Sequence, residues 1–243
     1  MNDIVAFQMI IPVAYSLQPV ASFTAYSLQS TAWIFLILSS YFIGSFPTGY
    51  LVGRYCGIDI RQHGSGNVGA TNVLRALGKK WGAFVFAIDV LKGWLPVFAA
   101  THWSDAMQIT PPSAPAAVAG IMALIGHSFP LWLRFKGGKG VATSVGIIIG
   151  MFPGAFPFCL AGWFLVFFTT GYVSLASMVA SAMLPLMMVI FFILGSNNEC
   201  PAWMQGDKLS LTISFVIAAL VIWRHRGNIK RLCEGTESSF KKK

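Results

Sequence analysis

Charged residues are scarce in this chain: they make up 10% of its 243 residues, against about 25% in an ordinary soluble domain. Hydrophobic residues make up 56%, so the composition predicts an integral membrane protein with little room for a soluble domain. Acidic residues are the rarer charged kind, and the net charge is +9. The positive charges lie next to apolar segments, where they act as topology signals and meet lipid headgroups. We therefore expect membrane lipid as a partner and no nucleic acid.

Several familiar catalytic and cofactor signatures are also missing. The cysteines lie far apart and share no metal-ligand spacing, at Cys56, Cys159, Cys200 and Cys233. The sequence therefore predicts neither a disulfide framework nor a zinc site. No cluster of carboxylates offers a magnesium site, and we expect no metal and no cofactor.

Common nucleotide-binding and nucleophile motifs are absent as well. No GxSxG nucleophile elbow occurs. The glycine-rich stretch at 136–140 lacks the Walker A pattern, because glycine follows Lys139 where that motif needs serine or threonine. No histidine begins an H-x4-D pattern, so the chain has no obvious strong general base. A substrate that already carries a good leaving group would suit such a chain.

Apolar segments that could cross a bilayer recur along the chain. A spanning helix needs about 20 apolar residues. We predict seven transmembrane helices, some short or broken, at 31–54, 81–101, 114–133, 141–152, 158–170, 178–194 and 209–223. Residues 141–152 give only about 18 Å of helix, so whether they span fully stays open. The predicted fold is an all-α integral membrane domain at 31–237, with an apolar extension at 1–30 and a basic tail at 238–243.

A few polar or small residues fall inside these segments. Asp89 and Lys92 are three residues apart, so they share a helix face; we interpret them as a structural ion pair, with a site role as the alternative. The small residues of GSFPTG at 44–49 predict either a helix-packing seam with a proline kink or a direct role in a site. His127 is interpreted as structural.

The basic residues predict the orientation of the helices. Seven spans put the termini on opposite faces, and a cytoplasmic C-terminus with a periplasmic N-terminus satisfies the positive-inside rule. The cytoplasmic segments, including Arg54, then hold every lysine and arginine except Lys92 and Lys208. They are 55–80, 134–140, 171–177 and 224–243. Because the same choice gathers the glycine-containing polar motifs on one face, we expect the functional site to face the cytoplasm.

These cytoplasmic segments form a cationic site with few carboxylates. Residues 61–75, RQHGSGNVGATNVLR, combine glycines, small polar side chains and an arginine at each end, which suits the binding of an anion. The polar residues of all four segments are Arg61, Ser65, Asn67, Asn72, Arg75, Arg134, Lys136, Lys139, Ser174, Ser177, Arg224, His225, Arg226 and Asn228. Arginine forks and lysine point charges favour a phosphorylated substrate.

Some of these residues have an equally good structural interpretation. Asn67 and Asn72 are as well explained by helix capping or by contacts that hold the loop. The basic residues of the tail are interpreted as headgroup anchors, at Arg224, Arg226, Lys230 and Arg231. The terminal lysines, from Lys241 onward, are expected to be solvated.

Five stretches, in order and over residues 31–237, resemble the motifs of the PlsY family of bacterial membrane enzymes. They are GSFPTGYLVGR, GSGNVGATNVLR, DVLKG, GHSFPLWLRFKGGKGVAT and HRGNIKRLCEGTE. The resemblance implies an acyltransferase that moves a fatty acyl group from acyl phosphate to the 1-hydroxyl of glycerol 3-phosphate. The products are 1-acylglycerol 3-phosphate (lysophosphatidic acid) and phosphate, in the first step of phospholipid synthesis. It also implies the bacterial inner membrane, no coenzyme A, and a functional link to the enzyme that produces acyl phosphate.

The resemblance also implies roles for individual residues. Ser65, Arg75 and Lys139 are the expected catalytic residues. Substrate binding is expected from His225 and Asn228, which hold glycerol 3-phosphate, and from Lys136, Ser177 (ahead of Ser174), Asn67 and Asn72.

A transporter for a phosphorylated solute is the alternative. It shares the cationic site and the membrane body, but it needs polar residues near the bilayer midplane on broken helices. Here the polar residues lie at one face, and only Asp89 and Lys92 are candidates deeper in the membrane.

Overall fold

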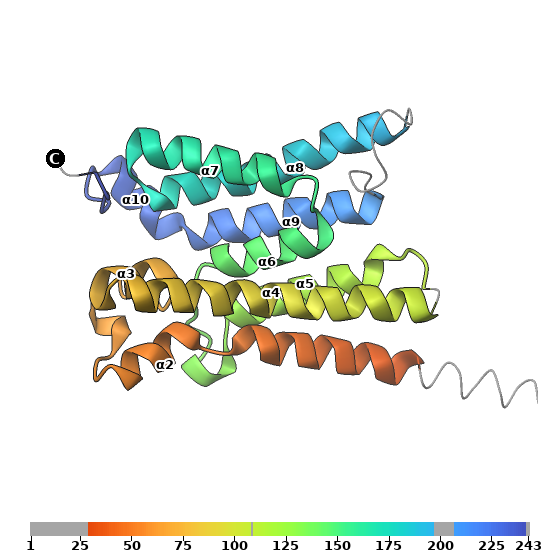
Figure 1. The fold of residues 1–243 in the computed structure, drawn as a ribbon, viewed down its shortest axis with the longest axis horizontal. Helices are drawn as coiled ribbons and strands as arrows, with labels where there is room; N and C mark the ends of the chain where they lie inside the picture. The colour runs from red at the N-terminus through yellow and green to blue at the C-terminus, as the bar shows by residue number, and fades with distance from the viewer. Residues whose placement is uncertain (1–28, 108, 197–206, 242–243) are drawn as a thin grey trace, which may run out of the picture.

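The computed structural model describes residues 29–107, 109–196 and 207–241, and all regular structure in these residues is helical (Figure 1). A helix over residues 29–45 comes first. The elements after it are α2 (Thr48–Tyr55), η1 (Ile60–Gln62), α3 (Ala70–Leu77), α4 (Lys79–Met107), α5 (Ser113–Ser128), η2 (Leu131–Leu133), α6 (Val141–Met151), α7 (Phe156–Thr170), α8 (Val173–Ser196), α9 (Lys208–Arg224) and α10 (Arg226–Cys233). The prediction of an all-α fold is confirmed for the described residues.

Each of the seven predicted segments contains a helix, but not every helix is long enough to span a bilayer alone. Four stretches are long and apolar enough, at Gln29–Tyr55, Lys79–Ala106, Ser113–Leu133 and Val173–Gly195. A fifth span results if α9 and α10, which meet at a 55° bend, are counted together. Helices α6 and α7 are apolar but have only 11 and 15 residues. Four or five spans are therefore supported, and seven stays a prediction.

Several sequence predictions fall outside the described residues. They are the extension at 1–30 except for its last two residues, Cys200, and the end of the basic tail at 242–243. Part of the predicted loop at 55–80 is helical: α3 is amphipathic and buries Asn72 and Val73. An apolar stripe on a short helix is enough to fold it against a larger apolar surface.

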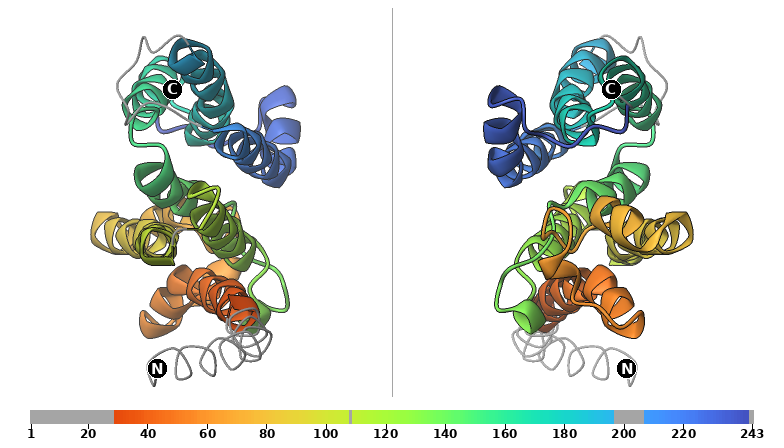
Figure 2. Two further views of the ribbon diagram at one scale, coloured as in Figure 1. Left: turned by 90° about the vertical axis from the view of Figure 1, so that its right-hand side faces the viewer. Right: turned by 90° about the vertical axis from the view of Figure 1, so that its left-hand side faces the viewer.

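The helices lie side by side in layers. Figure 2 shows the helix over 29–45 and α2 at one edge, α4 and α5 next to them, and α7, α8 and α9 at the other edge, with α6 between. Helices α2, α3 and α10 lie at the same end of the molecule (Figure 1). At the opposite end, the Ser113 hydroxyl at the start of α5 donates to the Asp207 carboxylate beside α9, at 2.5 Å.

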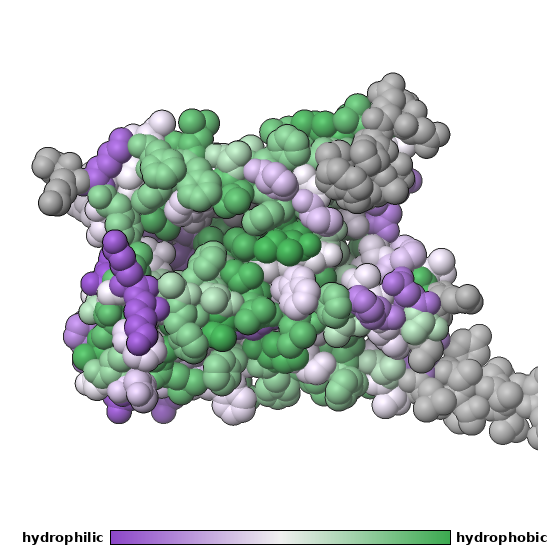
Figure 3. Space-filling view, viewed as in Figure 1, coloured by the Kyte–Doolittle hydropathy of each residue, from purple (hydrophilic) through white to green (hydrophobic). Residues whose placement is uncertain are grey.

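The outer surface has the pattern of a membrane protein. Apolar residues cover the middle of the molecule, and hydrophilic residues gather toward its two ends (Figure 3). Large apolar side chains are exposed on the described helices, such as Phe35 (73%), Leu165 (67%) and Phe168 (68%). Exposed apolar area of this extent is unfavourable in water, and a lipid environment removes that penalty.

Glycines bring pairs of helices into backbone contact. A Cβ atom on Gly93 of α4 would clash with the Thr143 carbonyl of α6, and one on Gly146 of α6 would clash with the Val90 carbonyl of α4. A Cβ atom on Gly44, in the GSFPTG stretch, would likewise clash with the α5 backbone. Small residues allow such close approach between membrane helices. The packing-seam interpretation of GSFPTG is therefore confirmed.

A buried ion pair supports the break between the first helix and α2. Lys92 Nζ lies 2.8 Å from Asp89 Oδ1, and both side chains are buried. Thr48 Oγ1 donates to Asp89 Oδ1 at 3.1 Å, and Lys92 Nζ donates to the Phe46 carbonyl at 3.0 Å. The pair thus satisfies a carbonyl that the helix break leaves without a helical partner. Its structural interpretation is confirmed.

The glycine contact between α4 and α6 gives a stability prediction. We expect Gly146→Ala to lower the free energy of unfolding by about 1–3 kcal/mol or more, because the clash is with rigid backbone. Gly227→Ala in α10 is the control, since the nearest atom to its added Cβ is 3.7 Å away. The measurement is thermal unfolding in detergent. Equal stability of the two variants would contradict the packing account.

Candidate active site

Asn72 organises the first polar loop. Its buried side chain accepts a hydrogen bond from the Ser65 N–H through Oδ1 at 2.9 Å. Its Nδ2 donates to the carbonyls of Ile60 (3.1 Å), His63 (2.9 Å) and Asn67 (2.9 Å). One side chain therefore fixes the backbone over most of the loop, and the loop-holding interpretation of Asn72 agrees with the structure.

In the same loop, Asn67 holds the backbone, whereas Ser65 and Arg61 are exposed at the surface. Asn67 Oδ1 accepts from the Gly69 N–H at 2.8 Å, at the start of α3. Ser65 is exposed between Gly64 and Gly66, which both have positive φ. Arg61 is bound to the Asp59 carboxylate through NH2 at 2.6 Å. The Arg61 guanidinium is therefore neutralised at the surface.

Arg224 holds the second polar loop, residues 134–140. Its Nε donates to the Gly138 carbonyl at 3.1 Å, and its NH2 donates to the carbonyls of Gly137 and Gly138, both at 2.9 Å. On the other side, the N–H groups of these glycines donate to the carbonyls of Ser128 and His127. Because Arg224 points into the protein, its interpretation as a headgroup anchor is wrong.

Lys139 is half-buried on this glycine loop and lies among other charges. The pKa of Lys139 is lowered to about 8, mainly by burial and also by the charges of Arg231, Arg75 and Arg224, while the Glu237 carboxylate opposes them. These charged groups therefore act on the same space from three of the four polar segments. Lys136, three residues earlier, is exposed.

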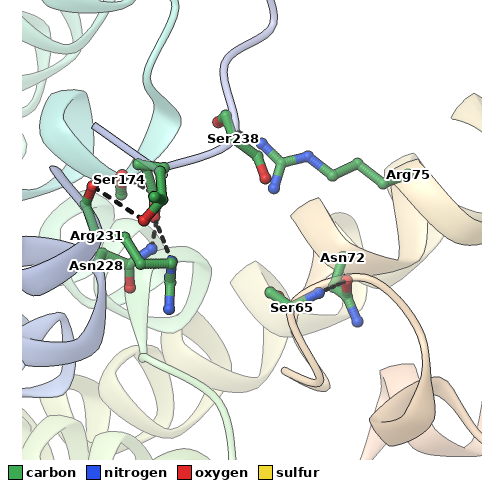
Figure 4. Close-up of polar contacts among 9 residues, drawn as sticks. Ser65, Asn72, Arg75, Ser174, Asn228, Arg231 and Ser238 are labelled. Carbon is green, nitrogen blue, oxygen red and sulfur yellow. Dashed lines mark hydrogen bonds and ion pairs between the residues drawn. The ribbon is translucent and has the colours of Figure 1, made fainter. Parts of the chain in front are cut away.

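The Glu237 carboxylate gathers the residues of the C-terminal half. Ser174 Oγ donates to Oε1 at 2.7 Å, Asn228 Nδ2 donates to Oε1 at 2.6 Å, and Arg231 Nε donates to Oε2 at 2.7 Å (Figure 4). Burial acts to raise the pKa of Glu237, but these hydrogen bonds together outweigh it and lower the pKa. Arg231 is thus an internal partner rather than a headgroup anchor, and its role was missed in the sequence, as was that of Glu237.

The two serines of VSLAS have different surroundings. Ser174 is part of the Glu237 cluster. Ser177 Oγ donates to the Val173 carbonyl at 2.7 Å and accepts from Trp163 Nε1 at 3.2 Å, within the packing of α7 and α8. Ser174 therefore lies with Asn228 and Arg231 around Glu237, whereas Ser177, which the sequence analysis put first, lies in the helix packing.

His225 lies buried at the bend between α9 and α10. Its Nδ1 is 2.7 Å from the Val221 carbonyl. A carbonyl only accepts, so Nδ1 carries the proton and Nε2 is the nitrogen that can meet a ligand. His225 and Asn228 thus come from the same short stretch, with Asn228 in the first turn of α10.

Arg75 extends from α3 toward the C-terminal segment (Figure 4). Its NH2 donates to the Ser238 carbonyl at 3.0 Å, and its guanidinium lies 4.7 Å from the centre of the Phe240 ring. The structure thus joins Arg75, Lys139, Ser174, His225 and Asn228 at one end of the molecule. In the part of the chain that the structure describes, no three metal-binding side chains come together.

Comparisons with known proteins identify relatives over most of the chain. The family model described as glycerol-3-phosphate acyltransferase matches residues 34–235. A protein of Geotalea daltonii named glycerol-3-phosphate acyltransferase is 42% identical over 212 residues, 87% of this chain and 100% of its own. One of the same name from Methylorubrum extorquens is 38% identical over 221 residues, 89% of this chain and 98% of its own.

Solved structures agree with these sequence relatives. The crystal structure of PlsY, an integral membrane glycerol 3-phosphate acyltransferase, in its glycerol 3-phosphate form is 38% identical, with a TM-score of 0.73 over 86% of this chain and 96% of that one. The lysophosphatidic acid form gives 37% identity and a TM-score of 0.71, with the same coverage.

The contacts of Arg224 give a prediction about the glycine loop. We expect Arg224→Ala to raise the hydrogen–deuterium exchange of the amides at 136–140 at least tenfold, because each lost hydrogen bond to a charged donor is worth about 1.5–3 kcal/mol. Arg226→Ala is the matched control, since Arg226 is exposed and lies over the Trp223 ring at 4.6 Å. Equal exchange in the two variants would contradict the role assigned to Arg224.

Proposed function

The chain belongs to the glycerol-3-phosphate acyltransferase family, and from that premise we propose that acyl phosphate is its acyl donor and that the Lys139 region is its reaction site. It is a multi-pass membrane enzyme that acylates glycerol 3-phosphate. The observation that carries the proposal is the convergence of Lys139, Arg75 and the Glu237 cluster at one end of the helices.

The charge balance supports a site for phosphate groups. The charges of three arginines act on Lys139 there, and the Glu237 carboxylate opposes them. Glu237 is itself engaged by Ser174, Asn228 and Arg231, so positive charge remains for an incoming anion. Lysine supplies a point charge and arginine a planar fork, which suit the two phosphate groups of the proposed substrates.

The proposed reaction needs little from a protein base. The 1-hydroxyl oxygen of glycerol 3-phosphate attacks the carbonyl carbon of acyl phosphate, and a new ester C–O bond forms. The bond between that carbon and the phosphate oxygen breaks, and phosphate leaves with the electron pair and accepts the hydroxyl proton. Lys139 stabilises the leaving phosphate as its negative charge increases, and Arg75 holds the phosphate group of the bound substrate, so charge stabilisation and proximity are the enzyme's main contributions.

In this proposal the remaining predicted site residues position the loops, pack the helices or lie exposed near the site. Asn72 and Asn67 position the first loop, and Ser65 lies on its exposed surface. Lys136 is exposed beside Lys139, where it attracts anionic substrates. Ser177 holds α7 against α8 through Trp163.

We assign the site to the cytoplasmic face of a bacterial inner membrane. The polar loops with most of the basic residues lie at the same end as α3 and α10 (Figure 1), and the positive-inside rule puts that end in the cytoplasm. A membrane-associated supply of acyl phosphate from its producing enzyme is consistent with that placement.

A transporter for a phosphorylated solute is less well supported. Asp89 and Lys92, its candidate midplane residues, are bound to each other, to Thr48 and to the Phe46 carbonyl. A transport site needs such groups to be available to a solute, whereas here they stabilise the break between the first helix and α2.

The donor proposal is tested with membranes that contain the protein. We expect 1-acylglycerol 3-phosphate to form from acyl phosphate and glycerol 3-phosphate, with a chelator present, because the reaction needs no metal. Lys139→Ala removes the central cation and should lower turnover at least about 100-fold. Product from acyl-coenzyme A but none from acyl phosphate would overturn the donor assignment. Uptake of labelled glycerol 3-phosphate into sealed vesicles without acylation would favour transport.

The lowered pKa of Lys139 predicts a pH dependence. The cationic form binds phosphate, and with a pKa of about 8 this form is lost as the pH rises through 8. We expect kcat/KM to fall roughly fivefold between pH 8 and pH 9, since with a pKa of about 8 the charged fraction falls from about one half to about one eleventh. Lys139→Arg stays charged and should keep a flat profile in this range. The same decline in that variant would show that another group titrates.

A further inference from the structure

The last described residues of the chain, Ser238–Lys241, form a short strap across the polar end. We call them the C-terminal strap. They directly follow Glu237 and lie beyond residue 235, where the family-model match ends. The sequence predicts a basic, solvated tail here, yet the backbone and side chains of the strap contact two separate parts of the protein.

One end of the strap is anchored on the turn between α7 and α8. The Phe240 N–H donates to the Gly171 carbonyl at 3.0 Å, and Lys241 Nζ donates to the Thr169 carbonyl at 2.5 Å. The Phe240 ring meets the Phe167 ring edge-on, with centres 6.0 Å apart. A Cβ atom on Gly171 would clash with the Ser239 hydroxyl, so the glycine permits this close contact.

The same strap holds the Arg75 side chain. The Ser238 carbonyl accepts from Arg75 NH2 at 3.0 Å (Figure 4). The centre of the Phe240 ring lies 4.7 Å from the guanidinium carbon. Arg75 belongs to α3, which packs on α2 and α4. The strap therefore links α3 to the α7–α8 turn, on the side of the molecule that carries Ser174 and Asn228.

Neighbouring positive charges repel the Arg75 guanidinium, so contacts with the strap are needed to keep it in place. The charges of Arg231 and Lys139 act against that of Arg75, and only Glu237 among the groups that act on it attracts it. An unrestrained arginine would move away from these cations into water. An aromatic face and a carbonyl attract a guanidinium without neutralising it, and a guanidinium has five N–H donors, so donors remain for phosphate.

We propose that Phe240 and the Ser238 carbonyl are positioning groups, which hold Arg75 in the orientation that binds the substrate phosphate. This inference rests on the proposed role of Arg75 as a phosphate ligand. Phe240 acts only through Arg75, so its loss weakens phosphate binding and leaves the chemistry of acyl transfer unchanged.

The test compares substitutions at Phe240 that keep its apolar packing. We expect Phe240→Leu to raise the KM for acyl phosphate or glycerol 3-phosphate roughly twofold to fivefold with little change in kcat, since leucine packs on Phe167 but offers no ring face. Phe240→Tyr restores the ring face and should restore the wild-type KM. Phe215→Leu, at an exposed position on α9, is the matched control. Truncation after Glu237 also removes the Ser238 carbonyl and should raise KM about tenfold or more.

The outcomes separate this inference from the proposed function. If Arg75→Ala raises KM strongly while Phe240→Leu and the truncation behave as wild type, the positioning role is overturned and the phosphate role of Arg75 stands. If Arg75→Ala itself has a normal KM, the proposed site assignment fails first. A lowered unfolding temperature in Phe240→Leu, without recovery of KM in Phe240→Tyr, would identify a merely structural role and overturn the inference.

Discussion

The Glu237 carboxylate connects the start of α8 to α10, two segments that are distant in the chain. It accepts hydrogen bonds from Ser174 at the start of α8 and from Asn228 and Arg231 on α10. A carboxylate with three such donors stays ionised, as its lowered pKa indicates. The position of α10, and therefore of the strap that follows Glu237, depends on this interaction.

This single carboxylate does not balance the positive charges around the site. Lys139, Arg75 and Arg224 surround the space that Glu237 borders, and burial already weakens the hold of Lys139 on its proton. An anionic substrate stabilises all of these cations at once, so binding it restores the charge balance. Charge stabilisation of phosphate, rather than a strong base, is therefore what this architecture offers to acyl transfer.

Sequence reasoning predicted the helical membrane body, the polar loops and the family, because composition and motif order carry that information. It ranked Ser177 ahead of Ser174, because residues three apart share a helix face and only tertiary contacts show that they have different partners. Arg224 has the sequence context of a headgroup anchor, yet its side chain points inward and donates to the backbone of the glycine loop. The strap could not be predicted either, because nothing in SSFKKK indicates which surface it covers.

The most direct measurement of the central claim is an experimental structure of this protein with glycerol 3-phosphate and a non-hydrolysable acyl phosphate analogue bound. We expect a phosphate group within hydrogen-bond distance of Lys139 Nζ and of the Arg75 guanidinium, with Glu237 still bound to Arg231. Phosphate groups bound elsewhere, with Lys139 directed away from them, would contradict it.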